Sequence, residues 1–193
     1  MVTSGCVIVL NGTTSSGKTT LASLLQAELA SAGECWIIIA LDDFFAKLPF
    51  DWVQLGNHVG AHAEQGIVFE MVDGEIERRL GPVGAQLIAA YRGAVGSAAR
   101  AGLNVIVDEV LLSEEDWEAW KVELAGLDPF WVRVELVLDL VEARERDRGN
   151  RVIGMARAQY GVVHRHATYD LVVDTATMDP KTAADAILAA RSP

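Results

Sequence analysis

Gly12-Thr13-Thr14-Ser15-Ser16-Gly17-Lys18-Thr19 decides the fold of this chain, because the stretch matches the pattern G-x-x-x-x-G-K-[ST] of a phosphate-binding P-loop. Gly12 and Gly17 permit backbone dihedrals that residues with a Cβ rarely adopt. The loop can therefore turn its N–H groups inward around an anion, and a helix that begins at about Lys18 adds the positive end of its dipole. The pattern predicts a binding site for nucleotide phosphates.

The same loop predicts how the nucleotide is held. We expect Lys18 to neutralise the β and γ phosphates of ATP and the hydroxyl of Thr19 to hold Mg²⁺. The residues expected to bind the nucleotide within the loop and directly after it are Gly12, Thr13, Thr14, Ser15, Ser16, Gly17, Lys18, Thr19 and Thr20.

The segments around the loop alternate between strand and helix. Residues 6–10 form a short apolar run, as in a buried parallel strand, and residues 20–29 repeat leucines at helical spacing. Further strands are predicted at 35–41, 104–108, 130–136 and 169–174, and further helices at 82–101, 114–125, 139–147 and 180–190. This order predicts a three-layer α/β fold of the P-loop NTPase type, with a five-stranded parallel sheet, helices on both faces and a single domain over residues 1–193.

Composition excludes several classes of protein. The chain has 193 residues, 51% of them hydrophobic, and a formal net charge of −11. An acidic chain lacks the basic surface that nucleic-acid binding needs, and no apolar run approaches the length of a membrane span. Because the start of the chain also lacks a signal-peptide pattern, we expect a cytoplasmic protein. Cys6 and Cys35 have no metal or redox spacing and are predicted to be buried thiols.

Acidic pairs follow two of the predicted strands. Asp42 and Asp43 come directly after the second strand, at the end of a parallel sheet where ligands bind. We interpret Asp42 as the base that takes the proton of an acceptor hydroxyl; helix capping is the alternative for both residues. Asp108 ends the third strand and is predicted to hold Mg²⁺ with Thr19, whereas the adjacent Glu109 could instead meet the acceptor.

The segment from 44 to 81 interrupts the alternation of strands and helices. It combines aromatic residues with glycine, histidine and acidic residues, and long irregular segments in compact proteins are usually functional or disordered. We interpret it as a wall of the acceptor pocket; the alternative is a surface insertion packed by its own side chains. His58 and His62 within it lack the further ligands that a zinc site needs.

A cluster of basic residues predicts a lid at about 144–157. Four arginines lie within eight residues of an otherwise acidic chain: Arg144, Arg146, Arg148 and Arg151. We expect Arg144 and Arg148 to bind the nucleotide, and Arg148 and Arg151 to stabilise charge on the transferring phosphoryl group. The alternative is a solvated helix face whose arginines pair with the neighbouring acids Glu142, Glu145 and Asp147.

Further short motifs accompany these residues along the chain. In chain order they are Val9-Leu10-Asn11-Gly12, Leu41-Asp42, Gly66-Ile67-Val68-Phe69, Gly81-Pro82, residues 101–110, Arg144-Glu145, Arg148-Gly149-Asn150-Arg151-Val152, Gly154-Met155-Ala156, Gln159, Val163-His164, Tyr169-Asp170 and Val173-Asp174-Thr175. In this combination the sequence resembles the chloramphenicol phosphotransferases and their relatives among the P-loop kinases, over nearly the whole chain. The P-loop motif occurs in many protein families, whereas the predicted lid followed by His164 is more specific to this family.

The resemblance implies a fold like that of the nucleoside-monophosphate kinases, with an arginine-bearing lid, ATP and Mg²⁺. It also implies that Asp42 is the base acting on a primary hydroxyl of the antibiotic. The sequence departs from the family pattern at Thr14, Ser16 and Asp43. Residues 41–45 are also similar to the corresponding strand end of uridine-kinase-type enzymes.

The expected function is ATP-dependent transfer of the γ-phosphate to a hydroxyl of a small molecule. The expected small molecule is an antibiotic such as chloramphenicol, and its inactivation by phosphorylation would confer resistance. One alternative is a kinase for a nucleoside, a sugar or a nucleoside-like antibiotic. A second, from another class, is a nucleotide-binding switch that regulates a partner protein and needs no acceptor base. The sequence leaves open whether the protein forms a homo-oligomer.

Overall fold

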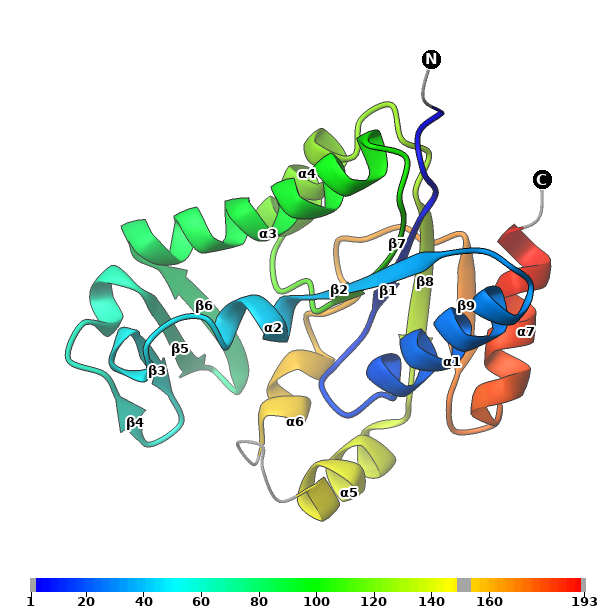
Figure 1. Ribbon diagram of the computed structural model, residues 1–193. Coiled ribbons are helices and arrows are strands. Elements are labelled where there is room, and N and C mark those ends of the chain that lie inside the picture. The colour runs from blue at the N-terminus through cyan, green and yellow to red at the C-terminus, as the bar shows by residue number, and fades with distance from the viewer. Residues whose placement is uncertain (1–2, 149–153, 192–193) are drawn as a thin grey trace.

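A computed structural model describes residues 3–148 and 154–191 of the chain (Figure 1). Its main sheet has five strands in the order β2-β7-β1-β8-β9, and every neighbouring pair is parallel. The strands are β1 (Val7–Asn11), β2 (Trp36–Ala40), β7 (Asn104–Glu109), β8 (Phe130–Glu135) and β9 (Leu171–Asp174). The sheet predicted from the apolar runs is therefore confirmed.

Helices cover both faces of this sheet. One face carries α1 (Lys18–Ser31) and α7 (Pro180–Arg191), and the other carries α3 (Pro82–Arg100) and α4 (Glu114–Glu123). Three further helices, α2 (Leu41–Phe45), α5 (Leu138–Arg148) and α6 (Met155–Tyr160), lie toward the end of the sheet where the P-loop emerges from β1.

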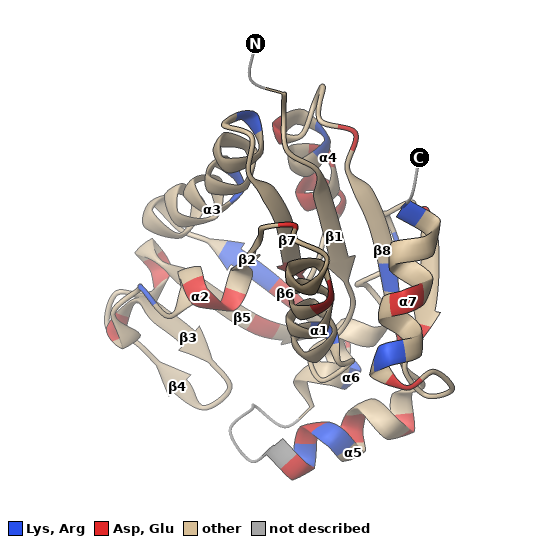
Figure 2. Ribbon diagram, turned by 45° about the vertical axis from the view of Figure 1, so that its right-hand side comes forward, with Lys and Arg blue, Asp and Glu red and all other residues tan. Residues whose placement is uncertain are grey.

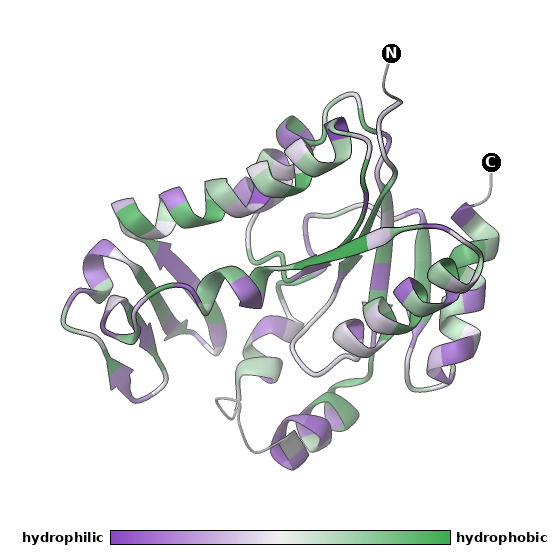
Figure 3. Cartoon of the chain, viewed as in Figure 1, coloured by the Kyte–Doolittle hydropathy of each residue, from purple (hydrophilic) through white to green (hydrophobic). Residues whose placement is uncertain are grey.

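Successive side chains of the central strands belong alternately to two clusters, one on each face of the sheet, so the core has two layers. In β1, Val7 and Val9 pack in the cluster with α3 and α4, whereas Ile8 and Leu10 pack in the cluster with α1 and α7. Because successive side chains of a strand point to opposite faces, a strand buried on both sides must be apolar throughout. In Figure 3 the strands of the main sheet carry mostly hydrophobic colouring, seen most plainly along β2.

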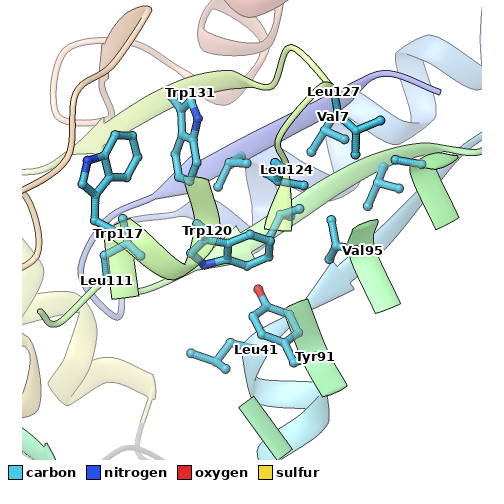
Figure 4. Close-up of a cluster of buried hydrophobic side chains, with 14 of the residues drawn as sticks. Val7, Leu41, Tyr91, Val95, Leu111, Trp117, Trp120, Leu124, Leu127 and Trp131 are labelled. Carbon is cyan, nitrogen blue, oxygen red and sulfur yellow. The ribbon is translucent and has the colours of Figure 1, made fainter. Parts of the chain in front are cut away.

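Aromatic side chains fill the layer between the sheet and α3 and α4 (Figure 4). Trp120 is fully buried and meets the rings of Tyr91 and Trp131 edge-on, with ring centroids 5.5 and 6.5 Å apart. Trp117 meets Trp131 at 4.6 Å. These three tryptophans therefore belong to the core of the protein.

The segment between α2 and α3 forms a second, four-stranded sheet in the order β4-β3-β5-β6. Its strands are β3 (Val53–Leu55), β4 (His58–Val59), β5 (Ile67–Val72) and β6 (Glu75–Leu80). The 3₁₀ turn Phe50–Trp52 precedes β3, and the 3₁₀ turn Ala63–Gln65 lies between β4 and β5. The expectation of irregular structure here was wrong. Asp73 and Gly74 have φ angles of 50° and 84°, which suit an Asp-Gly hairpin turn between β5 and β6.

The prediction of buried thiols was also wrong, since Cys6 and Cys35 are both exposed. Each lies just before its strand, at the amino-terminal edge of the sheet. Among the described residues, no helix is long and apolar enough to cross a membrane.

Candidate active site

The P-loop runs from the end of β1 into the first turn of α1. Gly17 adopts φ 101° immediately before the helix, a conformation that favours glycine. At Gly12, an added Cβ would lie 2.4 Å from the carbonyl oxygen of Val134, so that only glycine fits beside β8. Both glycines of the motif are therefore required by local geometry.

Lys18, Thr19 and Asp108 meet at the carboxyl end of the sheet. Parallel pairing of β1 with β7 sets Asp108 opposite Leu10, so the carboxylate reaches the start of α1. The hydroxyl of Thr19 donates to Oδ2 of Asp108 at 2.7 Å, and Nζ of Lys18 lies 3.8 Å from Oδ1. Nζ of Lys18 also donates to the carbonyl oxygen of Thr13 at 2.8 Å. The expected nucleotide and metal residues thus lie together.

The loop has the features of an anion cradle. The hydroxyl oxygens of Ser15 and Ser16 are buried, and neither has a hydrogen-bond partner in the described part of the chain. Buried polar atoms are normally hydrogen-bonded, and a bound phosphate would supply partners for them. Lys18 is only 5% exposed, so its positive charge is held close to the loop. These residues fit a nucleotide triphosphate.

Gln159 of α6 contacts this loop and is not among the site residues predicted from the sequence. Its side-chain oxygen accepts a hydrogen bond from the backbone N–H of Thr14 at 2.6 Å. The contact joins the P-loop to α6, whose first residues belong to the segment predicted as a lid. Nothing in local spacing identifies Gln159, because it lies 145 residues from Thr14 in the sequence.

A cavity of ≈ 340 Å³ opens beside Lys18 and reaches Asp42 and Asp43. Both aspartates lie in the first turn of α2, where Figure 2 shows acidic residues. The N-cap position of α2 is Ala40, and no side chain caps the helix, so the structure does not bear out the capping alternative. Asp42 therefore shares one open space with the phosphate cradle.

The remaining walls of this cavity are mostly apolar. Phe45 of α2, Leu55 of β3 and Phe69 of β5 line it from the side of the second sheet, and Met155 of α6 lines it from the lid. Phe45 and Phe69 meet edge-on, with ring centroids 5.8 Å apart. The segment between α2 and α3 thus contributes side chains to the same cavity as the P-loop.

A second cavity of ≈ 350 Å³ lies on the other side of the P-loop, between Arg144 and the start of α7. Nη2 of Arg144 donates to the carbonyl oxygen of Thr175 at 3.1 Å. The hydroxyl of Thr175 donates in turn to the carbonyl oxygen of Ser16 at 2.8 Å. Arg144 and Thr20 both line this cavity, and both are predicted from the sequence to contact the nucleotide.

The segment predicted as a lid includes a buried carboxylate, Glu145 of α5. Glu145, 1% exposed, accepts hydrogen bonds from the backbone N–H groups of Gly154 and Ala156, at 2.7 and 2.8 Å. Glu142 pairs instead with Arg157 at 2.5 Å. Figure 2 shows basic and acidic residues side by side along α5. The side chain of Arg148 and the whole of Arg151 lie outside the described residues.

Replacement of Glu145 by glutamine is expected to lower the free energy of unfolding by about 1–3 kcal/mol, because an amide can accept from only one of the two N–H groups. Chemical denaturation measures the change. The matched control is Glu142→Gln, which removes a partly exposed ion pair and is expected to cost less than about 1 kcal/mol. Equal losses in the two variants would contradict the anchoring role of Glu145.

A polar network behind the P-loop joins Asn11, Tyr169 and His164. Nδ2 of Asn11 donates to the phenol oxygen of Tyr169 at 2.6 Å, and that hydroxyl lies 2.8 Å from Nδ1 of His164. Burial, with the charges of Arg133 and Lys18, lowers the pKa of His164 to about 4, and burial raises the pKa of Tyr169 to about 12. Tyr169 is therefore the donor and neutral His164 the acceptor.

Stability should depend on the protonation of His164 between pH 4 and pH 6.5. Because folding lowers its pKa from 6.5 to about 4, the unfolded chain binds the proton more readily in this window. The stabilisation from neutral His164 is complete above pH 6.5 and is lost as the pH falls toward 4. We expect the unfolding free energy of the wild type to fall more steeply in this window than that of His164→Gln. Parallel pH profiles in chemical denaturation would contradict this assignment.

Glu109 lies in the core, away from the cavity, so the alternative that it meets the acceptor is not supported. It is 3% exposed and accepts hydrogen bonds from Nε1 of Trp120 and the backbone N–H of Val110, both at 2.7 Å. Burial, reinforced by the nearby charge of Asp116, raises its pKa. Within the described ranges, no group of three or more histidine, cysteine, aspartate or glutamate residues is arranged to hold a metal ion.

Comparison with known proteins adds a family and a fold. The family model described as chloramphenicol phosphotransferase-like protein matches residues 5–192. Rv2636 of Mycobacterium tuberculosis (strain ATCC 25618 / H37Rv), named as a candidate O-phosphotransferase, is 31% identical over an alignment of 177 positions that covers 89% of this chain and 75% of that protein.

Solved kinases share the architecture. The M. tuberculosis APS kinase CysC, in complex with AMPPNP and APS, has a TM-score of 0.67 at 18% identity and is covered to 98%, with 97% of this chain. A gluconokinase from Sinorhizobium meliloti 1021 has a TM-score of 0.57 at 15% identity, with 97% of this chain and 92% of that one covered. At these identities the likeness concerns the fold alone, which is that of the P-loop kinases.

Proposed function

Because this chain belongs to the chloramphenicol phosphotransferase-like family, we propose that it is an ATP-dependent O-phosphotransferase that acts on a hydroxyl of a small molecule. The observation that carries the proposal is the shared cavity, in which Asp42 faces the same space as Lys18 and Thr19 of the P-loop. A nucleotide switch would need the phosphate cradle but no carboxylate across an apolar-walled cavity. The arrangement therefore favours an enzyme.

The donor end of the site is assigned to the P-loop and Arg144. The backbone N–H groups of the loop and Lys18 hold the phosphates of ATP, and the cavity beside Arg144 receives the nucleoside. Thr19 and Asp108 are the residues that would hold Mg²⁺, which neutralises charge on the phosphates when it is bound. Arg148 and Arg151 remain assigned from the sequence alone, as stabilisers of the transferring group.

Asp42 is assigned as the base that takes the proton of the acceptor hydroxyl. As the acceptor oxygen bonds to the γ phosphorus, the bond from that phosphorus to the β–γ bridging oxygen breaks and ADP leaves. Asp42 orients the hydroxyl and takes its proton as the new bond forms. Lys18 stabilises the negative charge that spreads over the γ-phosphate oxygens.

The acceptor proposed first is chloramphenicol or a similar neutral, partly aromatic alcohol. The apolar side chains Phe45, Leu55 and Phe69 suit an aromatic or aliphatic body, and the carboxylates of Asp42 and Asp43 disfavour an anionic one. The product would carry a charged phosphate where the antibiotic had a neutral hydroxyl. Nucleosides and sugars are the competing acceptors.

Mass spectrometry of small alcohols incubated with the protein, ATP and Mg²⁺ tests the proposal. The panel begins with chloramphenicol and extends to nucleosides, sugars and nucleoside-like antibiotics. A gain of one phosphoryl group on chloramphenicol supports both the reaction and the acceptor, and a gain on another alcohol keeps the reaction and replaces the acceptor. ATP bound tightly with no product on any compound would contradict the enzyme and favour the regulatory switch.

A further inference from the structure

The two neighbouring arginines of β6 have opposite surroundings. Arg78 lines the cavity beside Asp42, and its side chain is only 6% exposed. Arg79 points to the other side of the second sheet, where it is 50% exposed and pairs with Glu64 and Glu70. This is the alternation of a strand, and it places one guanidinium rather than two at the cavity.

Arg78 is held in place by a buried carboxylate. Its Nη2 donates to Oδ1 of Asp116, whose side chain is 7% exposed. Oδ1 also accepts from Nη2 of Arg92 at 2.5 Å, and Oδ2 accepts from the backbone N–H of Leu112 at 3.2 Å. One carboxylate thus serves two arginines.

The hydrogen-bonding capacity of Arg78 is mostly unused. A guanidinium carries five N–H donors, and Asp116 takes a bond from Nη2. Within the described part of the chain, Nε is buried without a hydrogen-bond partner and Nη1 makes no hydrogen bond. The side chain of Arg78 is nine-tenths buried, lines the cavity and has unused N–H donors. We therefore expect it to donate a hydrogen bond to an oxygen of the molecule that occupies the cavity.

The chemistry around Arg78 limits what that oxygen can be. Phe69 lies directly opposite Arg78 in the β5–β6 pairing, so an apolar ring adjoins the guanidinium within the same cavity. Asp42 and Asp43 line the cavity too, and both disfavour a dianion such as a second phosphate. The positive charge of Arg78 is already neutralised in part by Asp116, so its unused N–H donors suit a neutral oxygen.

We propose that Arg78 is a specificity-determining residue that binds a second, neutral oxygen of the acceptor, such as a ketone or amide carbonyl, away from the hydroxyl that is phosphorylated. The preferred acceptor is then an apolar, partly aromatic alcohol with a carbonyl-type oxygen, and not a phosphorylated alcohol. This assignment rests on the proposed phosphotransferase function and extends it to the class of substrate.

Paired acceptors and paired variants test this assignment. The probes are an aryl alcohol that carries a ketone or amide oxygen and its analogue with CH₂ in place of the carbonyl. The variants are Arg78→Gln and, as the matched control on the outer face of β6, Arg79→Gln. For the carbonyl alcohol, Arg78→Gln is expected to raise the acceptor KM by about 10- to 100-fold, with the KM for ATP unchanged. For the CH₂ analogue, Arg78→Gln and the wild type should have the same kinetics.

Arg78→Lys keeps the charge beside Asp116 and serves if the glutamine variant does not fold. It should recover less than the full preference for the carbonyl alcohol, since an ammonium cannot reproduce a planar fork of donors. An unchanged acceptor KM in Arg78→Gln, or the same loss with both alcohols, would overturn the role of Arg78 while transfer itself continues. If no alcohol at all is phosphorylated by the wild type, the proposed function fails and this assignment with it.

Discussion

Replacement of Asp42 by asparagine is expected to lower the rate of phosphoryl transfer by about 10²–10⁴-fold while ATP still binds. Asparagine preserves the size of the side chain and can still contact a hydroxyl, but it cannot take a proton at neutral pH. The loss should fall on kcat, because the carboxylate acts as the acceptor oxygen bonds to phosphorus. Single-turnover transfer and ATP affinity, measured on the same preparation, separate these effects.

Asp43 offers the matched control for this prediction. It follows Asp42 in the first turn of α2 and lines the same cavity, so Asp43→Asn makes the same change of charge one residue away. We expect a much smaller loss of transfer in this variant. Full activity in Asp42→Asn, or equal losses in both variants, would mean that the base lies elsewhere or that only the charge of the cavity matters.

Replacement of Lys18 by alanine is expected to lower kcat by about 10²–10³-fold and to weaken productive binding of ATP as well. Lys18 lies at the start of α1, with Nζ 2.8 Å from the carbonyl oxygen of Thr13 and 3.8 Å from Oδ1 of Asp108. Its ammonium is therefore placed on the phosphate side of the cavity before any nucleotide arrives. Loss of this charge removes stabilisation from the phosphates and from the transferring group.

The control for Lys18→Ala is Lys121→Ala. Lys121 is 47% exposed on α4, and its ion pair with Glu118 is a surface contact. Both kinetics and ATP affinity should stay at wild-type values in this variant. Unchanged ATP affinity and rate in Lys18→Ala itself would count against the P-loop as the phosphate site.

The main sheet could be predicted because each of its strands contains a short apolar run. Strands buried on both faces, such as β1 and β7, leave an apolar run that does not depend on distant residues. The second sheet could not be predicted in the same way, since its strands are two to six residues long and carry charges such as Glu75 and Arg79. Only the Asp73-Gly74 pair signalled a hairpin there.

The site was predictable where its residues lie next to the ends of strands. Asp42 and Asp108 could be placed near the P-loop because the carboxyl ends of parallel strands meet at one edge of the sheet. Gln159 and Arg78 could not, because each reaches the cavity through contacts between segments that are far apart in the sequence. The opposite environments of Arg78 and Arg79 become visible only once β6 is known to be a strand.

Transfer of the γ-phosphoryl group from labelled ATP is the most direct test of the central claim. The wild type and Asp42→Asn are incubated with γ-labelled ATP, Mg²⁺ and the panel of alcohols, and the label is followed in the acceptor, in ATP and in inorganic phosphate. We predict that the label appears on one alcohol together with an equal amount of ADP, and that Asp42→Asn binds ATP but transfers the label about 10²–10⁴-fold more slowly. Label that stays in ATP or appears only as inorganic phosphate with every alcohol, equally in both proteins, would contradict this prediction.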